Sequence, residues 1–118
     1  MRLFHIIDRD VWAAAAEVGE YRPPSLATEG FVHCSYAEQV AGTANLIFAG
    51  VDGLCVVELD PARLDAEVRA EDSYDSGTAF PHIYGPVPTG ALVAVHDLGR
   101  DDDGVFSFVA AGSACRGH

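Results

Sequence analysis

Residues 30–50, GFVHCSYAEQVAGTANLIFAG, place a short strand directly in front of a helix. Gly30–His33 is predicted as the strand. Ser35, followed three residues later by Glu38, has the form of a capping box, which marks the start of a helix. The apolar residues that follow keep helical spacing up to Gly50, which ends the helix.

Towards the N-terminus the alternation of strand and helix continues. Arg2–Asp8 is predicted as a strand and Val11–Val18 as a helix, capped by one of the two aspartates before it and ended by Gly19. Residues 20–29 are predicted as a loop, since two consecutive prolines prevent regular structure there.

Beyond Gly50 the chain is predicted to be mostly strands. They are expected at Leu54–Leu59, Ala66–Glu71, Phe80–Tyr84, Ala91–Asp97 and Val105–Phe108, with a helical turn at Asp60-Pro61. Late strands with few helices between them favour an α+β fold over a doubly wound one. We expect one small mixed, mainly antiparallel sheet with two main helices.

The chain length fits one domain. The 118 residues leave no room for a second core, so residues 1–109 are expected to form a single α+β domain. Residues 110–118 are expected to be a flexible C-terminal tail, and Asp72–Thr78 a polar loop.

The charge balance excludes several classes of partner. Seven basic residues, all of them arginine, stand against 18 acidic ones, for a net charge of −11. An acidic surface repels a phosphate backbone and an anionic membrane, so neither nucleic acid nor membrane is expected as a partner. A small molecule or a protein is expected instead.

Other sequence signals concern the compartment. The apolar run Leu3–Ile7 is too short for a signal peptide, and no stretch approaches the ~20 apolar residues that cross a bilayer. Cys34, Cys55 and Cys115 are odd in number and widely spaced, which predicts reduced thiols. A cytoplasmic location is therefore expected.

The first candidate site segment lies between Gly30 and Ser35. In an extended strand Phe31, His33 and Ser35 point the same way, because side chains alternate. A helix N-terminus beside them offers free N–H groups to a ligand carbonyl or phosphate. His33 is therefore a candidate catalytic residue, with Gly30 and Ser35 as candidate ligand-binding residues. The structural alternative is that Ser35 is only a helix cap.

The second candidate segment is FPHIYGP, residues 80–86. Phe80, His82 and Tyr84 are expected to share one face of a strand, where two aromatic rings can hold a planar group. The imidazole supplies an acid, a base or a neutral hydrogen-bonding group. His82 is thus a candidate catalytic residue, with Phe80 and Tyr84 as ligand-binding residues. The structural alternative is an aromatic strand packed on the core.

Glu71 is the third candidate. It ends an alternating strand beside these segments, and its carboxylate can orient a ribose hydroxyl or stabilise a developing cation. The alternative is a solvated charged face shared with Glu67 and Arg69. No metal site is predicted, because His33, His82 and Cys34 lack ligand-pair spacing.

Four stretches together resemble a family of small bacterial proteins, domain-of-unknown-function family nine-five-two. They are EGFVHCS at 29–35, AEQVAGT at 37–43, VVELDP at 56–61 and FPHIYGP at 80–86. The resemblance covers roughly Arg2 to Val95. It extends distantly to the ADP-ribosyltransferase-like fold, which includes the catalytic domain of poly(ADP-ribose) polymerase and the tRNA 2′-phosphotransferase.

That resemblance implies roles for particular residues. In the fold, an early strand carries His, a small residue and then Ser or Thr, and His33-Cys34-Ser35 is similar to this element. A later aromatic residue stacks on nicotinamide, which implies Tyr84. The fold often completes its site with a late glutamate, and no glutamate follows Glu71 here. Either Glu71 is recruited from another strand, His82 replaces it, or the domain binds without turnover.

The residues and the resemblance leave two main functions open. The first is an ADP-ribosyltransferase-like enzyme that uses NAD or an NAD-derived ribose phosphate. His33 and Ser35 would position the ribose, Tyr84 and Phe80 would pack the nicotinamide, and His82 or Glu71 would support an oxocarbenium-like transition state. The second is a non-catalytic ligand-binding or protein-interaction domain. A metal-dependent hydrolase that uses both histidines is a third alternative.

Overall fold

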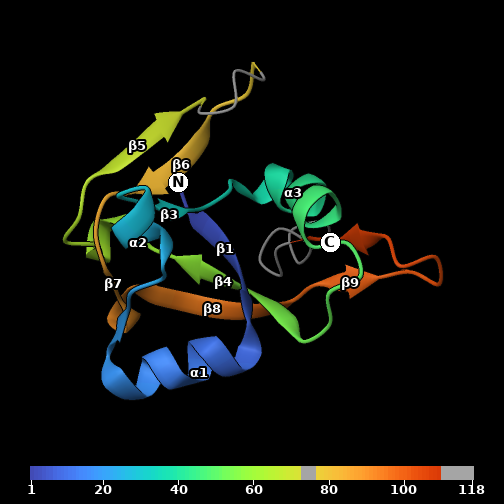
Figure 1. Ribbon diagram of the computed structural model, residues 1–118, viewed down its shortest axis with the longest axis horizontal. Helices are drawn as coiled ribbons and strands as arrows, with labels where there is room; N and C mark the ends of the chain where they lie inside the picture. The colour runs from blue at the N-terminus through green and yellow to red at the C-terminus, as the bar shows by residue number, and fades with distance from the viewer. Residues whose placement is uncertain (73–76, 110–118) are drawn as a thin grey trace, which may run out of the picture.

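The computed structural model describes residues 1–72 and 77–109, and its fold is α+β (Figure 1). The expected tail at 110–118 and part of the expected loop, residues 73–76, lie outside the described residues. In chain order the elements are β1 (Leu3–Asp8), α1 (Arg9–Val18), β2 (Glu20–Tyr21), α2 (Ser25–Thr28), β3 (Val32–His33), the 3₁₀ turn Ala37–Gln39, α3 (Val40–Ile47), β4 (Leu54–Leu59), the 3₁₀ turn Pro61–Arg63, β5 (Val68–Glu71), β6 (Phe80–Ile83), β7 (Val87–Pro88), the 3₁₀ turn Thr89–Ala91, β8 (Leu92–Asp97), β9 (Gly99–Arg100) and β10 (Phe106–Ser107).

The strands divide among several sheets rather than forming the one mixed sheet expected. One three-stranded sheet has the order β1-β4-β8 and another has the order β3-β6-β5, while β2-β7 and β9-β10 form two-stranded ribbons. Every pairing between these strands is antiparallel. The two larger sheets meet where Phe4 of β1 bridges to Ser35, just beyond β3.

The β1-β4-β8 sheet is covered on both faces, which explains the continuous apolar run in β1. Alternate side chains of β1 enter two separate cores: Leu3 and Ile7 pack in one, Phe4 and Ile6 in the other. The first core is completed by Trp12 of α1 and by the inner face of the β3-β6-β5 sheet, the second by α3 and Phe106. Burying each such aliphatic side chain stabilises the fold by about 1.5–3 kcal/mol.

The first helix begins two residues earlier than predicted, at Arg9, and its expected end is confirmed. The Asp8 carboxylate accepts the N–H groups of Asp10 at 2.8 Å and Val11 at 3.2 Å. Gly19 closes the helix in the left-handed conformation with φ 95°, which glycine adopts without a Cβ penalty. Trp12 is the residue that α1 buries.

Two local predictions are corrected. Residues 20–29 are not all loop, because Glu20–Tyr21 pairs with β7 and Ser25–Thr28 forms one helical turn. The capping box lies one residue later than expected: the Tyr36 N–H donates to the Gln39 Oε1 at 3.0 Å. The reason is that the Ser35 backbone is already paired with Phe4, so the helical turn starts after it.

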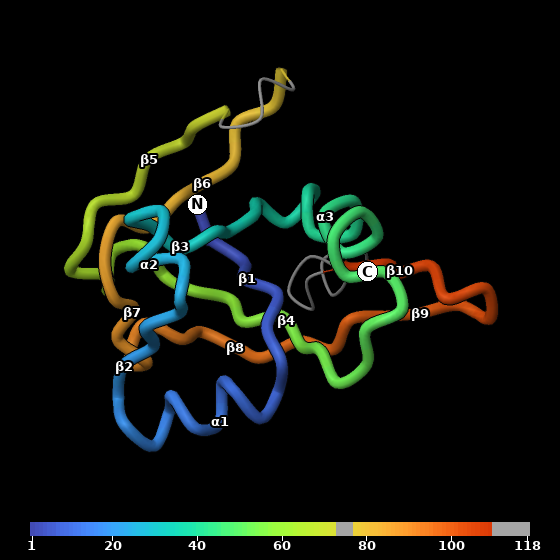
Figure 2. Tube along the Cα trace, in the orientation of Figure 1, coloured from blue at the N-terminus to red at the C-terminus, as the bar shows by residue number. Residues whose placement is uncertain are grey.

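Figure 2 follows the chain through this arrangement. The blue β1 runs through the middle of the molecule, the hairpin of β5 and β6 projects at the top, and α1 lies at the bottom. Within the described residues, no helix has the length and apolar character needed to cross a membrane.

Candidate functional site

The outer face of the β3-β6-β5 sheet gathers the residues of both motifs. His33 of β3 lies directly opposite His82 of β6, and His82 lies opposite Arg69 of β5. The neighbouring residues, Val32 and Ile83, point the other way into the core. Strand alternation therefore sends the apolar residues inward and the imidazoles outward, as the sequence predicts.

Four rings form the centre of this face: Phe31, His33, His82 and Tyr84, here called the ring cluster. Phe31 stacks on His82 with 4.0 Å between ring centroids and 16° between planes. Phe31 also meets His33 edge-on at 4.9 Å and Tyr84 at 5.3 Å. The His33 and His82 centroids are 5.4 Å apart, so the two motifs converge in space.

Glu71 joins the ring cluster from the end of β5. One of its oxygens, Oε1, accepts hydrogen bonds from the Tyr84 hydroxyl and from His82 Nδ1, the latter at 2.9 Å. The Tyr84 hydroxyl, and after it the His82 imidazole, lower the pKa of the Glu71 carboxyl. The same bond to Glu71 raises the pKa of Tyr84. A carboxylate can only accept, so His82 donates to Glu71 through Nδ1.

Two further carboxylates flank the ring cluster. The Nε2 of His33 lies 3.0 Å from an oxygen of Glu29, and the His33 side chain is 37% exposed. Glu67 accepts two hydrogen bonds from Arg69, at 2.8 and 3.0 Å, which lower the pKa of the Glu67 carboxyl. The Arg69 guanidinium lies over the Tyr84 ring, 4.5 Å from its centroid.

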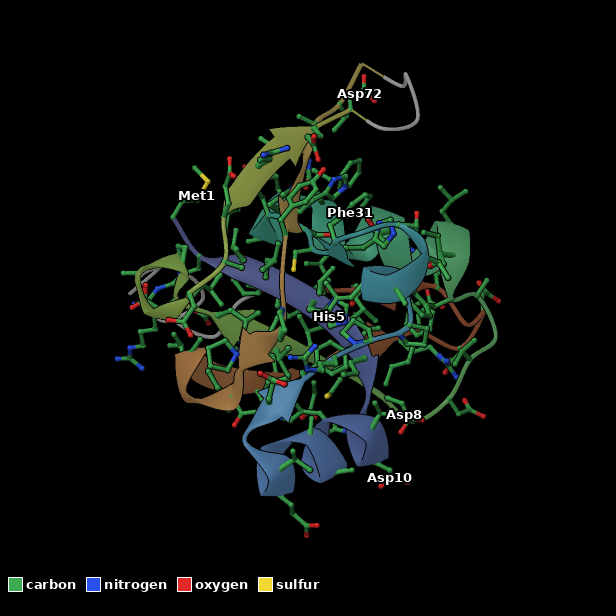
Figure 3. The ribbon with its side chains drawn as sticks, turned by 60° about the vertical axis from the view of Figure 1, so that its left-hand side comes forward. Met1, His5, Asp8, Asp10, Phe31 and Asp72 are labelled. Carbon is green, nitrogen blue, oxygen red and sulfur yellow. The ribbon has the colours of Figure 1, made fainter. Side chains whose placement is uncertain are left out.

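His5 supports His33 from behind. Its Nδ1 donates to the His33 carbonyl at 2.5 Å, and its Nε2 accepts from the Tyr21 hydroxyl at 3.0 Å. The His5 side chain is half-buried, and the desolvation of its ring lowers the pKa of His5 to about 4. Figure 3 shows His5 near the middle of the molecule and Phe31 between it and the hairpin that ends near Asp72.

The contact between His5 and His33 follows from the direction of the His33 carbonyl. The N–H of Cys34 donates to the Pro81 carbonyl, which turns the His33 carbonyl away from β6 and towards β1. Backbone pairing between β1 and the β3 segment is made at Ser35, so the His5 side chain supplies the donor for the His33 carbonyl. His5 was interpreted from the sequence as structural; it also fixes the backbone of a candidate site residue.

Three of the candidate residues lie apart from the ring cluster. Ser35 is buried, with its hydroxyl 3.5 Å from that of Thr43, and it does not share the outer face with His33. Gly30 has φ 88°, and its N–H donates to the Ser25 carbonyl, so a turn explains the glycine. Phe80 lies opposite Glu71 at the far end of β6, and the ring that stacks on His82 is Phe31.

Phe31, Glu29 and Arg69 were not chosen as site residues from the sequence. Phe31 lies two positions before His33 and was expected on the same face. That spacing was the sequence signal that could have identified Phe31 as a site residue. Arg69 and Glu67 were interpreted as a solvated face, and the sequence carries no sign that the guanidinium lies on Tyr84.

The cysteines that the structure describes lie in the core rather than in the ring cluster. Cys34 and Cys55 are free and buried, and burial raises the pKa of Cys34 to about 12. Over residues 1–72 and 77–109, no three His, Cys, Asp or Glu side chains converge as metal ligands do.

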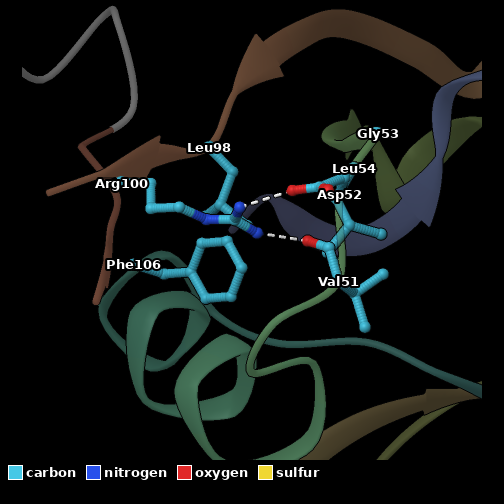
Figure 4. Close-up of a pocket in the computed structure, with 7 residues that line it drawn as sticks. All are labelled: Val51, Asp52, Gly53, Leu54, Leu98, Arg100 and Phe106. Carbon is cyan, nitrogen blue, oxygen red and sulfur yellow. Dashed lines mark hydrogen bonds and ion pairs between the residues drawn. The ribbon is translucent and has the colours of Figure 1, made fainter. Parts of the chain in front are cut away.

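A separate hollow lies where the turn before β4 meets β9, lined by Val51, Asp52, Gly53, Leu54, Leu98, Arg100 and Phe106 (Figure 4). Arg100 donates to Asp52 at 2.6 Å and to the Val51 carbonyl, and its guanidinium lies 4.6 Å from the centre of the Phe106 ring. These contacts make Arg100 a clamp between two segments of the chain.

The chain is similar to a protein family and to solved structures. Residues 6–95 match a family model described as Protein of unknown function (DUF952). The crystal structure of protein CC0527 from Caulobacter crescentus is similar, with a TM-score of 0.79 and 30% identity over 91% of this chain and 94% of that one. Its solution NMR structure gives a TM-score of 0.71 and 30% identity over 88% and 90% of the two chains. No curated protein matches the chain.

Proposed function

The chain belongs to the DUF952 family, and we propose that its ring cluster binds a nicotinamide nucleotide of the NAD type, as ADP-ribosyltransferase-like enzymes do. One observation carries the proposal. Tyr84 and Glu71 are hydrogen-bonded, and His33 lies in ring contact with His82 and Phe31 at the same place. These residues lie on or directly beside three strands, β3, β5 and β6. His33 and Tyr84 are the positions to which the resemblance assigns the ribose and nicotinamide contacts.

The geometry assigns a different aromatic partner from the one expected. Phe31, rather than Phe80, is the aromatic ring that packs against both His82 and Tyr84. His33, whose ring is partly exposed, is placed to reach a ribose hydroxyl. His82 is 1% exposed and stacked beneath Phe31, so its role is to hold Glu71 rather than to touch a ligand.

Glu71 supplies the charge that the reaction needs. In the proposed transfer, the bond between the ribose C1′ and the nicotinamide nitrogen breaks, and its electron pair leaves with nicotinamide. A lone pair of the acceptor forms the new bond to C1′, and the acceptor's proton passes to a carboxylate. A fixed negative charge stabilises the positive charge that builds on the ribose. The lowered pKa of Glu71 keeps it ionised at neutral pH.

A second candidate is a binding domain without turnover. The observation that favours it is that Oε1 of Glu71 is already occupied by two donors, Tyr84 and His82. A carboxylate engaged in this way is a weaker base, and such an arrangement suits ligand recognition as well as chemistry.

The test is a titration of the protein with NAD up to millimolar concentration, followed by the NMR signals of the His33 and Tyr84 rings. His33→Gln is the test variant and His96→Gln is the control, because His96 also pairs with a glutamate, Glu58 at 2.7 Å, but on the other sheet. We expect saturable shifts in the unaltered protein. In His33→Gln the Tyr84 signals are expected to give a dissociation constant at least ~10-fold higher, and in the control the constant is expected to stay unchanged.

Release of nicotinamide is measured in the same samples. Release that is lost in Glu71→Gln supports the transferase, while binding without release supports the binding domain. The absence of any shift at millimolar NAD would contradict both forms of the proposal, and a new ligand class would then be needed.

A further inference from the structure

The Tyr84 ring, to which the proposed function assigns a ligand contact, already carries the guanidinium of Arg69. The guanidinium carbon lies 4.5 Å from the ring centroid. Phe31 also approaches the Tyr84 ring, at 5.3 Å between centroids with a tilt of 44°. A planar group that stacks on Tyr84 from the side of Arg69 must therefore displace the guanidinium.

Glu67 holds the guanidinium in place. Arg69 Nε donates to one carboxylate oxygen of Glu67 at 2.8 Å and Nη2 to the other at 3.0 Å, so the two groups meet fork to fork. Arg69 lies on β5 and Glu67 directly precedes that strand, and a spacing of two positions in extended chain puts their side chains on the same face.

This ion pair is open to water. The Arg69 side chain is 51% exposed and the Glu67 side chain 62% exposed. Exposed pairs between charged side chains contribute little net stability because water competes for both partners. The guanidinium is thus easy to move, and its five donors suit any oxyanion that approaches in place of Glu67.

We propose that Arg69 is a gate that selects ligands carrying an oxyanion, such as a phosphate, next to the planar ring. The ring takes the place of the guanidinium on Tyr84, and the phosphate takes the guanidinium over from Glu67. A ligand with the ring alone has to move Arg69 without offering it a new partner. The inference rests on the proposed function and adds to it a requirement for phosphate.

Two ligands that differ by one phosphate provide the test, namely nicotinamide riboside and nicotinamide mononucleotide. Their dissociation constants are measured by calorimetry with the unaltered protein and with three variants, Arg69→Ala, Glu67→Gln and Arg22→Ala. Arg22 is the matched control, because it pairs with Glu20, also two residues away and exposed, on a different strand.

In Arg69→Ala we expect the riboside to bind more tightly and the mononucleotide to bind about tenfold more weakly, so that the preference for phosphate collapses. Glu67→Gln frees the guanidinium and is expected to tighten mononucleotide binding. Arg22→Ala is expected to change neither constant.

If Arg69→Ala changes both constants by the same factor, or changes neither, the gate is wrong while the nicotinamide site stands. If neither ligand binds the unaltered protein or Arg69→Ala, the proposed function and the gate are both wrong. Circular dichroism of each variant shows whether the fold is retained, and Glu67→Gln keeps the gate testable if Arg69→Ala does not fold.

Discussion

The rings of Phe31 and His82 lie face to face, with centroids 4.0 Å apart and planes 16° from parallel. Phe31 lies just before β3 and His82 within β6, so the stack joins the two motifs across a strand pair. It also leaves His82 only 1% exposed. Because aromatic faces exclude water, the bond between His82 and Glu71 is shielded on this side.

Phe31→Ala is expected to weaken NAD binding by about tenfold or more, since it removes the ring that covers His82 and faces Tyr84. Phe80→Ala is the control, because Phe80 is similarly half-buried but lies at the far end of β6. We expect the control to change affinity by less than about threefold, as measured by calorimetry. An equal or larger loss in Phe80→Ala would mean that the ligand packs on Phe80, as expected from the sequence.

Glu71→Gln is expected to lower the pKa of Tyr84 towards its ordinary value. The bond to the Glu71 carboxylate, and after it desolvation, raise this pKa, because both disfavour the phenolate. NMR of protein with ¹³C-labelled tyrosine rings measures the titration directly. Glu58→Gln is the control, because Glu58 pairs with His96 on the other sheet and leaves both the Tyr84–Glu71 bond and Arg69 in place. A Tyr84 pKa that is unchanged by Glu71→Gln would show that this bond does not form in solution.

His5 is expected to make stability depend on pH. Its pKa is about 4 in the folded protein because burial disfavours the charged ring, whereas an exposed histidine has a pKa near ~6.5. As the pH falls from about 6.5 to 4, the unfolded chain takes up this proton first. The stabilisation is therefore complete above about pH 6.5, and up to roughly 3 kcal/mol is lost towards pH 4.

His5→Asn isolates this contribution. The amide nitrogen of asparagine replaces Nδ1 as the donor to the His33 carbonyl, but it does not titrate. Urea unfolding at several pH values from 7 to 4.5 should show a shallower loss of free energy in the variant. Identical slopes in the two proteins would mean that the ring is charged or solvated in the folded state.

Gly85→Ala is expected to destabilise the protein by about 1–3 kcal/mol through overpacking. A Cβ at Gly85 would lie 2.8 Å from the Cβ of Ala66, closer than two carbons can pack. Gly90→Ala is the control, because nothing lies within 4 Å of the added methyl group. Equal stability of the two variants by chemical denaturation would contradict the close approach of these segments.

The sequence was sufficient to predict the local structure of most segments. The strand at Leu54–Leu59 and the turn after Asp60-Pro61 are confirmed, because their signals are local: an apolar run and a proline at the first helical position. The resemblance to the DUF952 family, drawn in part from FVHCS and FPHIYGP, is also confirmed. The start of the helical turn after Ser35 was wrong, because a long-range partner, Phe4, occupies that serine.

Strand alternation correctly predicted the orientation of some site residues, but not of others. Alternation put Phe31 and His33 on one face of their strand, and His82 and Tyr84 on one face of theirs. In the structure these two faces form the same side of one sheet, and the rings are in contact. Alternation could not show that Ser35 turns away, because the chain leaves β3 before that residue. The position of Arg69 on Tyr84 depends on strand register, which the local sequence does not encode.

The Phe4–Ser35 bridge also bears on how the molecule opens. Within the described chain, this bridge is the backbone pairing between the β1-β4-β8 and β3-β6-β5 sheets, with bonds of 2.8 and 2.7 Å. Proteins exchange amide hydrogens through partial openings that follow such weak boundaries. We therefore expect the whole β3-β6-β5 sheet to open before the β1-β4-β8 sheet, so that its amides exchange faster than those of β4. A ligand held by Glu71 and Tyr84 would therefore slow exchange in the β3-β6-β5 sheet more than in the β1-β4-β8 sheet.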